Sequence, residues 1–290
     1  MQLTNSEYQN RIFLFQICFI ISLVLIMIYQ GTYPTWSVIA ILLVIVSVWS
    51  KLGWSFIKDF LPFFLILVTY GTVYNQQHSI ASGNVEINLL INFEKFLFSG
   101  YIPSAYIQNS LLFKEPWYDI LKPLMEISYM THFTIPIVFA WIIWQKQKNY
   151  YWQYITGFLI LTYAGFLTFT FFPAAPPWYA SYYGYLQGSD YVKNISFFTP
   201  EILINSSFPV AAIPSLHAAY PFYVSLFTLF IWGKKTSLVF IYPLIISFAT
   251  LYLGHHYVID LLIGYTYAAI SYVISLKLLN KKSHESNQTY

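Results

Sequence analysis

The sequence has few charged residues, a single arginine and a single cysteine. Only 9% of its 290 residues are charged, whereas 58% are hydrophobic and 21% are aromatic. So few charges cannot solvate the surface of a globular domain of this length, which argues against a water-soluble protein. The lone Cys18 rules out an internal disulfide and a thiolate metal cluster. The net charge of +3 is small and the lysines lie near the ends of apolar segments, so nucleic-acid binding is not indicated.

Long apolar segments occupy most of the chain. A membrane-spanning helix needs about 20 mostly apolar residues, and roughly eight such segments are separated by short polar breaks. We expect them near residues 12–29, 35–50, 54–74, 118–144, 152–173, 213–232, 237–254 and 258–280. The first segment follows Arg11 and has no small-residue cleavage site after it, so we interpret it as a retained span. The predicted fold class is an all-α polytopic membrane protein, a bundle of about eight transmembrane helices.

Lysine clusters predict the orientation in the membrane. Lysines collect in short cytoplasmic loops, and here they fall on every second connection between predicted spans or on the C-terminal tail. The clusters are Lys51 and Lys58, Lys146 and Lys148, Lys234 and Lys235, and Lys281 and Lys282. We therefore expect both termini in the cytoplasm. The long connections 75–117 and 173–213 then lie on the extracytoplasmic or lumenal side.

The two long outer connections differ in their predicted local structure. Segment 87–98 has apolar residues at helical spacing, with Glu94 and other charged residues on another face, as in a helix that lies on the membrane surface. Segment 172–179 is rich in proline and aromatic residues, which argues against a regular helix. We expect Trp178 and Tyr179 to anchor it at the membrane interface.

Three ionisable residues stand out because charged groups within or beside membrane spans are costly and often functional. His217 begins the sixth predicted span, and His256 and Asp260 begin the eighth. The sixth and seventh spans form a hairpin that returns the chain to the side from which it left. Both histidines are therefore expected at the same outer face. One isolated histidine at a helix end would suggest a structural role, but two histidines and a carboxylate together favour catalysis.

The spacing of these residues suggests a chemistry. On a helix, Asp260 lies four residues from His256 and can hold one imidazole nitrogen. That hydrogen bond fixes the tautomer and leaves the other nitrogen as a nucleophile. His217 on the opposite side could donate a proton to a leaving oxygen and later accept one from an incoming hydroxyl.

Segments 214–217 and 256–260 resemble the last two motifs of the membrane-bound type 2 phosphatidic acid phosphatase superfamily. They are most similar to its inositol phosphorylceramide synthase-like branch. Weaker similarities occur at residues 58–62, 129–133 and 172–179. The resemblance implies a catalytic membrane core with six helices within residues 54–280. N-terminal transmembrane helices at 1–53 precede it, and a polar cytoplasmic tail at 281–290 follows it.

The resemblance also implies a reaction. His256 would attack a lipid phosphate ester in line and form a phosphohistidine, with Asp260 as its orienting residue and His217 as the acid/base. The phosphoryl group would then pass to an alcohol or to water, without a metal or other cofactor. The implied partners are a phospholipid donor and a lipid alcohol acceptor in the bilayer, with the site on the extracytoplasmic or lumenal side.

The chain departs from the phosphatases of this superfamily in its lack of arginine. Those enzymes clamp the phosphate with lysine and arginine side chains. Here Arg11 is at the wrong face, and Thr250 stands six positions before His256, where the phosphatase motif has arginine. A phosphodiester carries one negative charge and needs less compensation than a phosphomonoester dianion, so we favour transfer over hydrolysis of a monoester.

Other residues are candidates for contact with the substrate. They are Ser215, His255, His132, Lys122 and Tyr257. Lys122 could instead form an ion pair with Glu126 on the same helical stripe. His132 lies near the middle of a span and should face the inside of the bundle.

Two alternatives remain from the sequence. A lipid phosphatase would use the same residues with water as the acceptor, and the acceptor depends on pocket shape and on exclusion of water. A transporter or scramblase would also explain ionisable residues in the membrane. Transporters usually contain paired repeats with broken helices, and the sequence has no such pairing.

Overall fold

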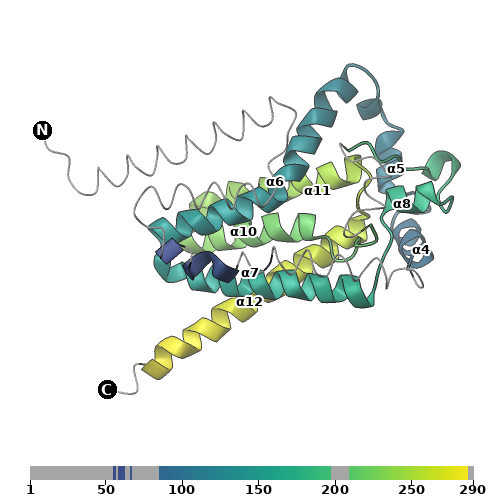
Figure 1. Cartoon of the computed structure of the whole chain (residues 1–290). Helices are drawn as coiled ribbons and strands as arrows, with labels where there is room; N and C mark the ends of the chain where they lie inside the picture. Colours follow the sequence, from purple (N-terminus) through teal and green to yellow (C-terminus); the bar gives the residue numbers. More distant parts are fainter. Residues whose placement is uncertain (1–54, 57, 63–65, 67–84, 197–208, 287–290) are drawn as a thin grey trace, which may run out of the picture. The chain divides into compact units, whose positions relative to one another are not determined.

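The computed structural model describes residues 55–286 except for 57, 63–65, 67–84 and 197–208 (Figure 1). The predicted spans 12–29 and 35–50 lie outside the described residues, and only short pieces of the span 54–74 lie within them. The chain forms two compact units, Met1–Thr69 and Tyr70–Tyr290. In the first unit, the rings of Phe56 and Phe60 stack with their centroids 4.1 Å apart.

Long helices make up most of the second unit (Figure 1). They are α6 (Trp117–Lys146), α7 (Lys148–Phe171), α10 (Leu216–Trp232), α11 (Ile241–Tyr252, preceded by the 3-10 helix η3, Lys234–Phe240) and α12 (Val258–Ser286). Among the described residues, four helical segments are long and apolar enough to cross a membrane, and α10 is a shorter apolar helix. The prediction of an all-α, polytopic membrane protein is confirmed, and the fourth to eighth predicted spans coincide with these helices.

Helix α10 is packed against α6, α7, α11 and α12. Small residues allow the close approach at its first turn. A Cβ added to Gly264 of α12 would lie 2.4 Å from the backbone oxygen of Ser215, and one added to Gly165 of α7 would lie 2.9 Å from the Leu216 side chain. Close contact at small residues is typical of helix packing in membranes. The start of α10 is therefore fixed between α7 and α12.

Hydrogen bonds between helices satisfy polar groups inside this bundle. The hydroxyl of Tyr220 donates to Oγ1 of Thr162 at 3.1 Å, and the hydroxyl of Tyr223 donates to the backbone oxygen of Tyr154 at 2.8 Å. These bonds join α10 to α7. Unpaired polar groups are expensive in a bilayer, so the bonds make the register between the two helices specific.

Short helices and extended segments cover one end of the bundle. The helices are α4 (Asn88–Leu97), α5 (Pro103–Gln108) and α8 (Pro177–Tyr182), and the 3-10 turns are η1 (Leu111–Phe113) and η2 (Gly188–Asp190). Isolated parallel bridges join Ala174 to Glu86 and to Ala211. We call this region the cap.

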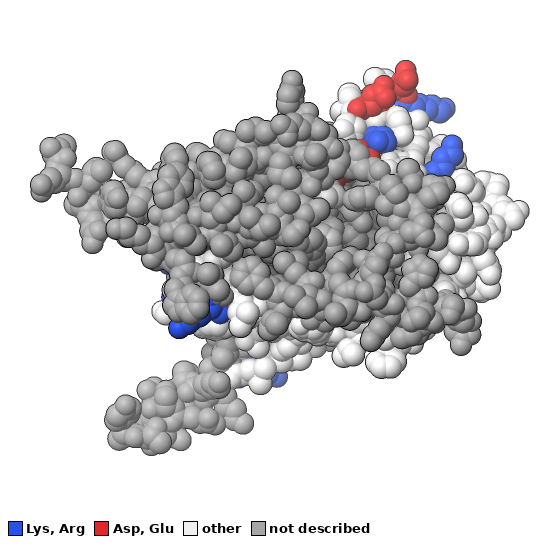
Figure 2. Space-filling model, viewed as in Figure 1, with Lys and Arg blue, Asp and Glu red and all other residues white. Residues whose placement is uncertain are grey.

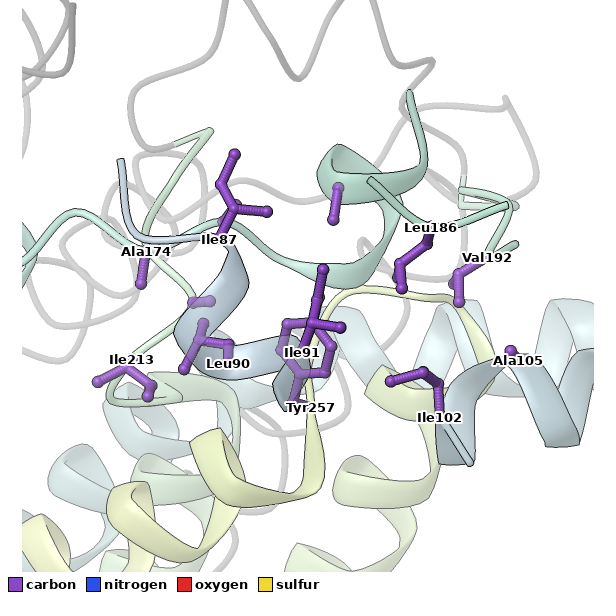
Figure 3. Packing of buried hydrophobic residues seen from close by; sticks show 13 residues of the cluster. Ile87, Leu90, Ile91, Ile102, Ala105, Ala174, Leu186, Val192, Ile213 and Tyr257 are labelled. Carbon is purple, nitrogen blue, oxygen red and sulfur yellow. The ribbon is translucent and has the colours of Figure 1, made fainter. Parts of the chain in front are cut away.

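An apolar cluster holds the cap together (Figure 3). It consists of Ile87, Leu90, Ile91, Ile102, Ala105, Ala174, Ala175, Ala180, Leu186, Val192, Ala212, Ile213 and Tyr257. Leu90 and Ile91 of α4 belong to this cluster together with Tyr257. The predicted helix at 87–98 is therefore confirmed as α4. Its buried face packs on the cap, while Leu89, Phe93 and Phe96 remain exposed.

The proline-rich segment differs from the prediction in two respects. It contains a regular short helix, α8, because Pro177 occupies the first turn, where its missing N–H would have no partner in the helix. Trp178 is only 3% exposed, so it is not an interfacial anchor. Its backbone N–H donates to the oxygen of Gly254 at 3.1 Å, which joins α8 to the turn between α11 and α12.

Charged side chains of the described residues are visible at both ends of the helical bundle (Figure 2). The red atoms in this view lie at the end where α6 begins, together with blue atoms. The lysines at 146 and 148 and at 234 and 235 lie at the α6–α7 and α10–η3 connections. Since α10 and α12 both begin at the cap, these connections belong to the opposite end of the bundle. Lysines in short connections between spans are typical of cytoplasmic loops.

The Gly264 contact yields a stability prediction. Gly264→Ala places a methyl group against the Ser215 backbone, which no side-chain rotation can relieve. We expect the free energy of unfolding to fall by about 1–3 kcal/mol, a typical cost of overpacking. Thermal unfolding in detergent measures this change. Thr266→Ala, at an exposed position of α12, is the control. An unchanged melting temperature for Gly264→Ala would contradict the packing described here.

Candidate active site

A histidine at the start of α10 meets a histidine of the α11–α12 turn beneath the cap. His217 lies in the first turn of α10, and His256 lies in the turn that connects α11 to α12. The distance between Nδ1 of His217 and Nε2 of His256 is 2.9 Å. His256 is buried and His217 is half-buried. The expected meeting of these side chains at one end of the bundle is thus observed.

Asp260 holds both His256 and the beginning of α12. Its Oδ2 atom lies 3.3 Å from Nδ1 of His256 and accepts the backbone N–H of Tyr257 at 2.8 Å. Helix α12 begins at Val258, so His256 precedes the helix instead of lying on it as the spacing argument assumed. The contact is nevertheless made, because a side chain at the third helical position reaches back to the residues before the helix.

These bonds assign the protons of the histidine pair. A carboxylate accepts hydrogen bonds, so Nδ1 of His256 carries the proton and Nε2 has the lone pair. That lone pair accepts the proton on Nδ1 of His217. Burial lowers the pKa of His256 to about 3, so the ring is neutral at physiological pH. His256 therefore has the tautomer of a nucleophile.

Two further histidines complete what we call the histidine cluster, which consists of His132, His217, His255 and His256. The ring of His132, from α6, lies 3.9 Å from the ring of His217. Tyr129 stacks against both His217 and His255, with centroid distances of 4.4 and 5.0 Å. Tyr129 lies in a segment that the sequence singled out, but its role between the rings was not anticipated.

Two ring nitrogens of the cluster remain available for a ligand. Nε2 of His132 and Nε2 of His255 are buried and have no hydrogen-bond partner among the described residues. The other nitrogen of His132 contacts the backbone oxygen of Tyr129. Burial, and then the neighbouring His256, lower the pKa of His255 to about 3. The structure thus brings both histidines close to His217 and His256.

Ser215 and Tyr257 have structural contacts. The Ser215 hydroxyl is buried and accepts the backbone N–H of Ala218 at 3.3 Å, which caps α10. The backbone N–H of Ser215 donates to the oxygen of Asp260 at 3.0 Å and so joins the starts of α10 and α12. The Tyr257 ring packs in the apolar cluster, and its hydroxyl has no partner among the described residues.

Lys122 forms the ion pair that the sequence offered as the alternative to a phosphate contact. Its Nζ atom lies 3.0 Å from Oε1 of Glu126, four residues further along α6. The Glu126 side chain is almost fully buried, whereas Lys122 is partly exposed. The pair neutralises a carboxylate that would otherwise be costly in this position.

Helix α5 contributes contacts that sequence reasoning missed. The hydroxyl of Ser104 donates to the backbone oxygen of His256 at 3.1 Å. The side-chain amide of Gln108 donates to the backbone oxygens of Lys193 and Tyr252, at 2.9 and 3.1 Å. These bonds fix the turn that carries the histidines. Their partners are backbone atoms far away in sequence, so no residue pattern could have indicated them.

The bundle and its paired histidines define a polytopic membrane protein with a candidate histidine-based active site. The family model described as "PAP2 superfamily" matches residues 89–274. The chain belongs to this superfamily, and the resemblance stated from its motifs is confirmed.

Three relatives are similar over 36% to 65% of this chain. A phosphoinositol dihydroceramide synthase of Bacteroides thetaiotaomicron is 26% identical over 205 residues, which cover 65% of this chain and 67% of the relative. The inositol phosphorylceramide synthase catalytic subunit of Schizosaccharomyces pombe is 28% identical over 58% of this chain and 43% of its own. The corresponding subunit of Saccharomyces cerevisiae is 35% identical over 36% of this chain and 28% of its own length. The matched region thus spans less than half of each fungal relative.

No solved structure matches the chain. The family and its named relatives confirm the predicted class, an enzyme that acts on lipid phosphate esters.

The geometry at Asp260 predicts the effect of removing its charge. Asp260→Asn should lower kcat by roughly 100- to 10,000-fold, because an amide no longer stabilises the tautomer and the developing charge of His256. Enzyme turnover at saturating lipid measures this effect. Asp190→Asn, which changes a carboxylate in the ion pair with Lys95 at the surface, is the matched control. Equal activity of the two variants would exclude Asp260 from the site.

Proposed function

We propose that this protein is a lipid phosphotransferase that moves inositol phosphate from a phospholipid to a ceramide-type lipid alcohol. The observation that carries the proposal is the 2.9 Å contact between His217 and His256, with Asp260 behind His256. The relatives' names supply the substrate class, since each is a synthase of a phosphoinositol-containing ceramide lipid. The proposed catalytic core is residues 54–280, with transmembrane helices at 1–53 before it and a tail at 281–290 after it.

In the first step, Nε2 of His256 attacks the phosphorus of the donor. The bond from phosphorus to the glycerol oxygen breaks, and His217 in its imidazolium form donates a proton to that oxygen, so that diacylglycerol leaves and His217 becomes neutral. Asp260 stabilises the positive charge that develops on His256. Because Nε2 of His256 receives a hydrogen bond from His217, the phosphoryl group must replace that hydrogen bond when it enters. The product is an inositol-phosphoryl group on His256.

In the second step, the hydroxyl of the lipid alcohol attacks the same phosphorus. His217 accepts the hydroxyl proton as the new oxygen–phosphorus bond forms and the bond to Nε2 of His256 breaks. His256 returns to its neutral form with the proton on Nδ1. No net proton is consumed over the cycle, and one phosphodiester replaces another.

We further propose that His132 and His255 contact the phosphate oxygens. The free nitrogens of both rings lie in the histidine cluster. Because Nδ1 of His132 faces a carbonyl oxygen, Nε2 of a neutral His132 has a lone pair and can donate only after the ring takes up a proton. A phosphate anion favours this protonation. Such a site suits the single charge of a phosphodiester better than a dianion.

Burial of the site supports transfer over hydrolysis. His255 and His256 are buried, and the cap covers the turn that carries them. Excluding water protects a reactive phosphohistidine until the lipid alcohol arrives. Water as the acceptor, which would make the protein a phosphatase, remains the second candidate function.

The protein is an integral membrane protein, and we propose that the site faces the extracytoplasmic or lumenal side with both termini in the cytoplasm. The lysines at the α6–α7 and α10–η3 connections support this orientation, since they lie at the end away from the cap. Donor and acceptor would enter sideways from the outer leaflet.

A transfer assay tests the proposed function. Purified protein in mixed micelles is given phosphatidylinositol labelled in the inositol ring, together with ceramide. We expect labelled inositol phosphorylceramide and an equal amount of diacylglycerol. His217→Ala and His256→Ala should reduce product formation by at least about 1,000-fold, because each removes a reacting group.

Other products would identify the alternative functions. Labelled inositol phosphate without a lipid product would indicate a hydrolase. Lipid flux across vesicles that persists in His256→Ala, with no turnover of phospholipid, would indicate a scramblase.

The phosphate contacts predict an effect on substrate affinity. His132→Gln and His255→Gln should each raise KM for the donor roughly tenfold, the loss expected for one charge-assisted hydrogen bond. Lys122→Gln should lower thermal stability, because Glu126 stays buried, but should leave KM unchanged. Initial rates at varied donor concentration measure KM. A raised KM in Lys122→Gln, with unchanged values in both histidine variants, would reverse this assignment.

A further inference from the structure

Helix α4 places a second carboxylate at the beginning of α12. Glu94 is fully buried. Its Oε1 atom accepts the backbone N–H of Val258 at 2.9 Å, and its Oε2 atom lies 3.4 Å from the N–H of Ile259. Asp260 accepts the preceding N–H, that of Tyr257. Carboxylates from two elements thus bind three successive amides at the helix start, where unpaired N–H groups and the helix dipole favour negative charge.

These amides lie between the nucleophile and its orienting carboxylate in the chain. His256 precedes the three residues, and Asp260 follows them. Any rotation of this turn changes the 3.3 Å contact between Nδ1 of His256 and Oδ2 of Asp260. Ser104 of α5 also donates a hydrogen bond to the backbone oxygen of His256. Side chains from two cap helices therefore hold this turn.

An ionised Glu94 does not increase the stability of the fold at neutral pH. Burial, and to a smaller degree the nearby Asp260, raise its pKa from 4.5 to about 7, although the amides of Val258 and Ile259 oppose the shift. A carboxyl group whose pKa rises on folding stabilises the folded state most below pH 4.5. This stabilisation is lost as the pH rises toward 7. At neutral pH a buried glutamine would therefore cost less than the glutamate.

We propose that Glu94 is a positioning residue of this enzyme, which holds the first turn of α12 so that Asp260 keeps His256 aligned for attack. The inference rests on the proposed function, because it assumes that His256 is the nucleophile. Glu94 acts through the backbone and does not touch the substrate. The sequence placed it only on the charged face of an interfacial helix.

Only the ionised Glu94 side chain accepts hydrogen bonds from both amides. Transfer activity should therefore depend on the ionisation of Glu94. As the pH falls through about 7, Glu94 takes up a proton and keeps only one good acceptor oxygen. The titratable groups that face it among the described residues are Asp260 of α12 and Tyr257 in the preceding turn. Lys95, next to it on α4, is paired with Asp190 at 2.6 Å. We therefore expect transfer activity to fall below pH 7.

The test compares Glu94→Gln with Glu86→Gln, the same change at an exposed carboxylate in the segment before α4. Transfer rates are measured across the neutral pH range, together with melting temperatures at pH 8. Glu94→Gln should lose about 10- to 100-fold in rate at pH 8, as expected for a misaligned reacting group, and should lack the decline centred near pH 7. Its melting temperature at pH 8 should equal or exceed that of the wild type. Glu86→Gln should match the wild type in all respects.

Two results would overturn the role of Glu94. One is a pH dependence of the Glu94→Gln transfer rate that has the same shape as that of the wild type, whatever the absolute rate. A residue with only a structural role would give this result. The other is a lower melting temperature at pH 8 that accounts for the lost activity. Failure of the proposed function is distinguished by the wild type and His256→Ala. If the wild type makes no transfer product, the function itself is wrong, whereas an active wild type with an unaltered Glu94→Gln profile contradicts only this inference.

Discussion

The site depends on one carboxylate that accepts hydrogen bonds from a side chain and from the backbone. Oδ2 of Asp260 lies 3.3 Å from Nδ1 of His256 and 2.8 Å from the N–H of Tyr257. The same interaction therefore sets the tautomer of His256, the proposed nucleophile, and the place where α12 begins. The backbone oxygen of Asp260 also accepts the N–H of Ser215, two residues before His217. Through this one residue, the orientation of one histidine is coupled to the position of the other.

The bundle and the cap determine different aspects of the geometry around Asp260. The bundle sets the distance between the two histidines, since Gly264 lets the start of α10 approach α12 and Gly165 makes room for Leu216. The cap sets the orientation of the turn, through hydrogen bonds from α5 and the apolar cluster around Tyr257. Helix packing alone could not supply these bonds, because the backbone groups before a helix have no partner inside it.

The sequence predicts the parts of this structure that leave a local pattern. Span lengths and the alternation of connections between the two membrane sides placed His217 and His256 at the same face. The spacing of Lys122 and Glu126 offered their ion pair as an alternative to a phosphate contact. The sequence does not indicate that Trp178 is buried, because composition cannot distinguish a packed cap from a lipid-facing loop. It also does not reveal the contacts of Ser104, since a hydroxyl that binds a distant backbone oxygen leaves no periodicity in the chain.

The histidine cluster suggests why the site can bind a phosphate ester without arginine. An arginine is always charged, so a site built on it carries its positive charge before any ligand arrives. Burial keeps His255 and His256 neutral, so these rings carry no positive charge before a ligand binds. Positive charge would then develop only as a phosphate enters and a histidine takes up a proton. Since each such protonation occurs against the cost of burial, an ester with one negative charge is favoured over a dianion. The same neutrality keeps a lone pair on His256, as its proposed role as the nucleophile requires.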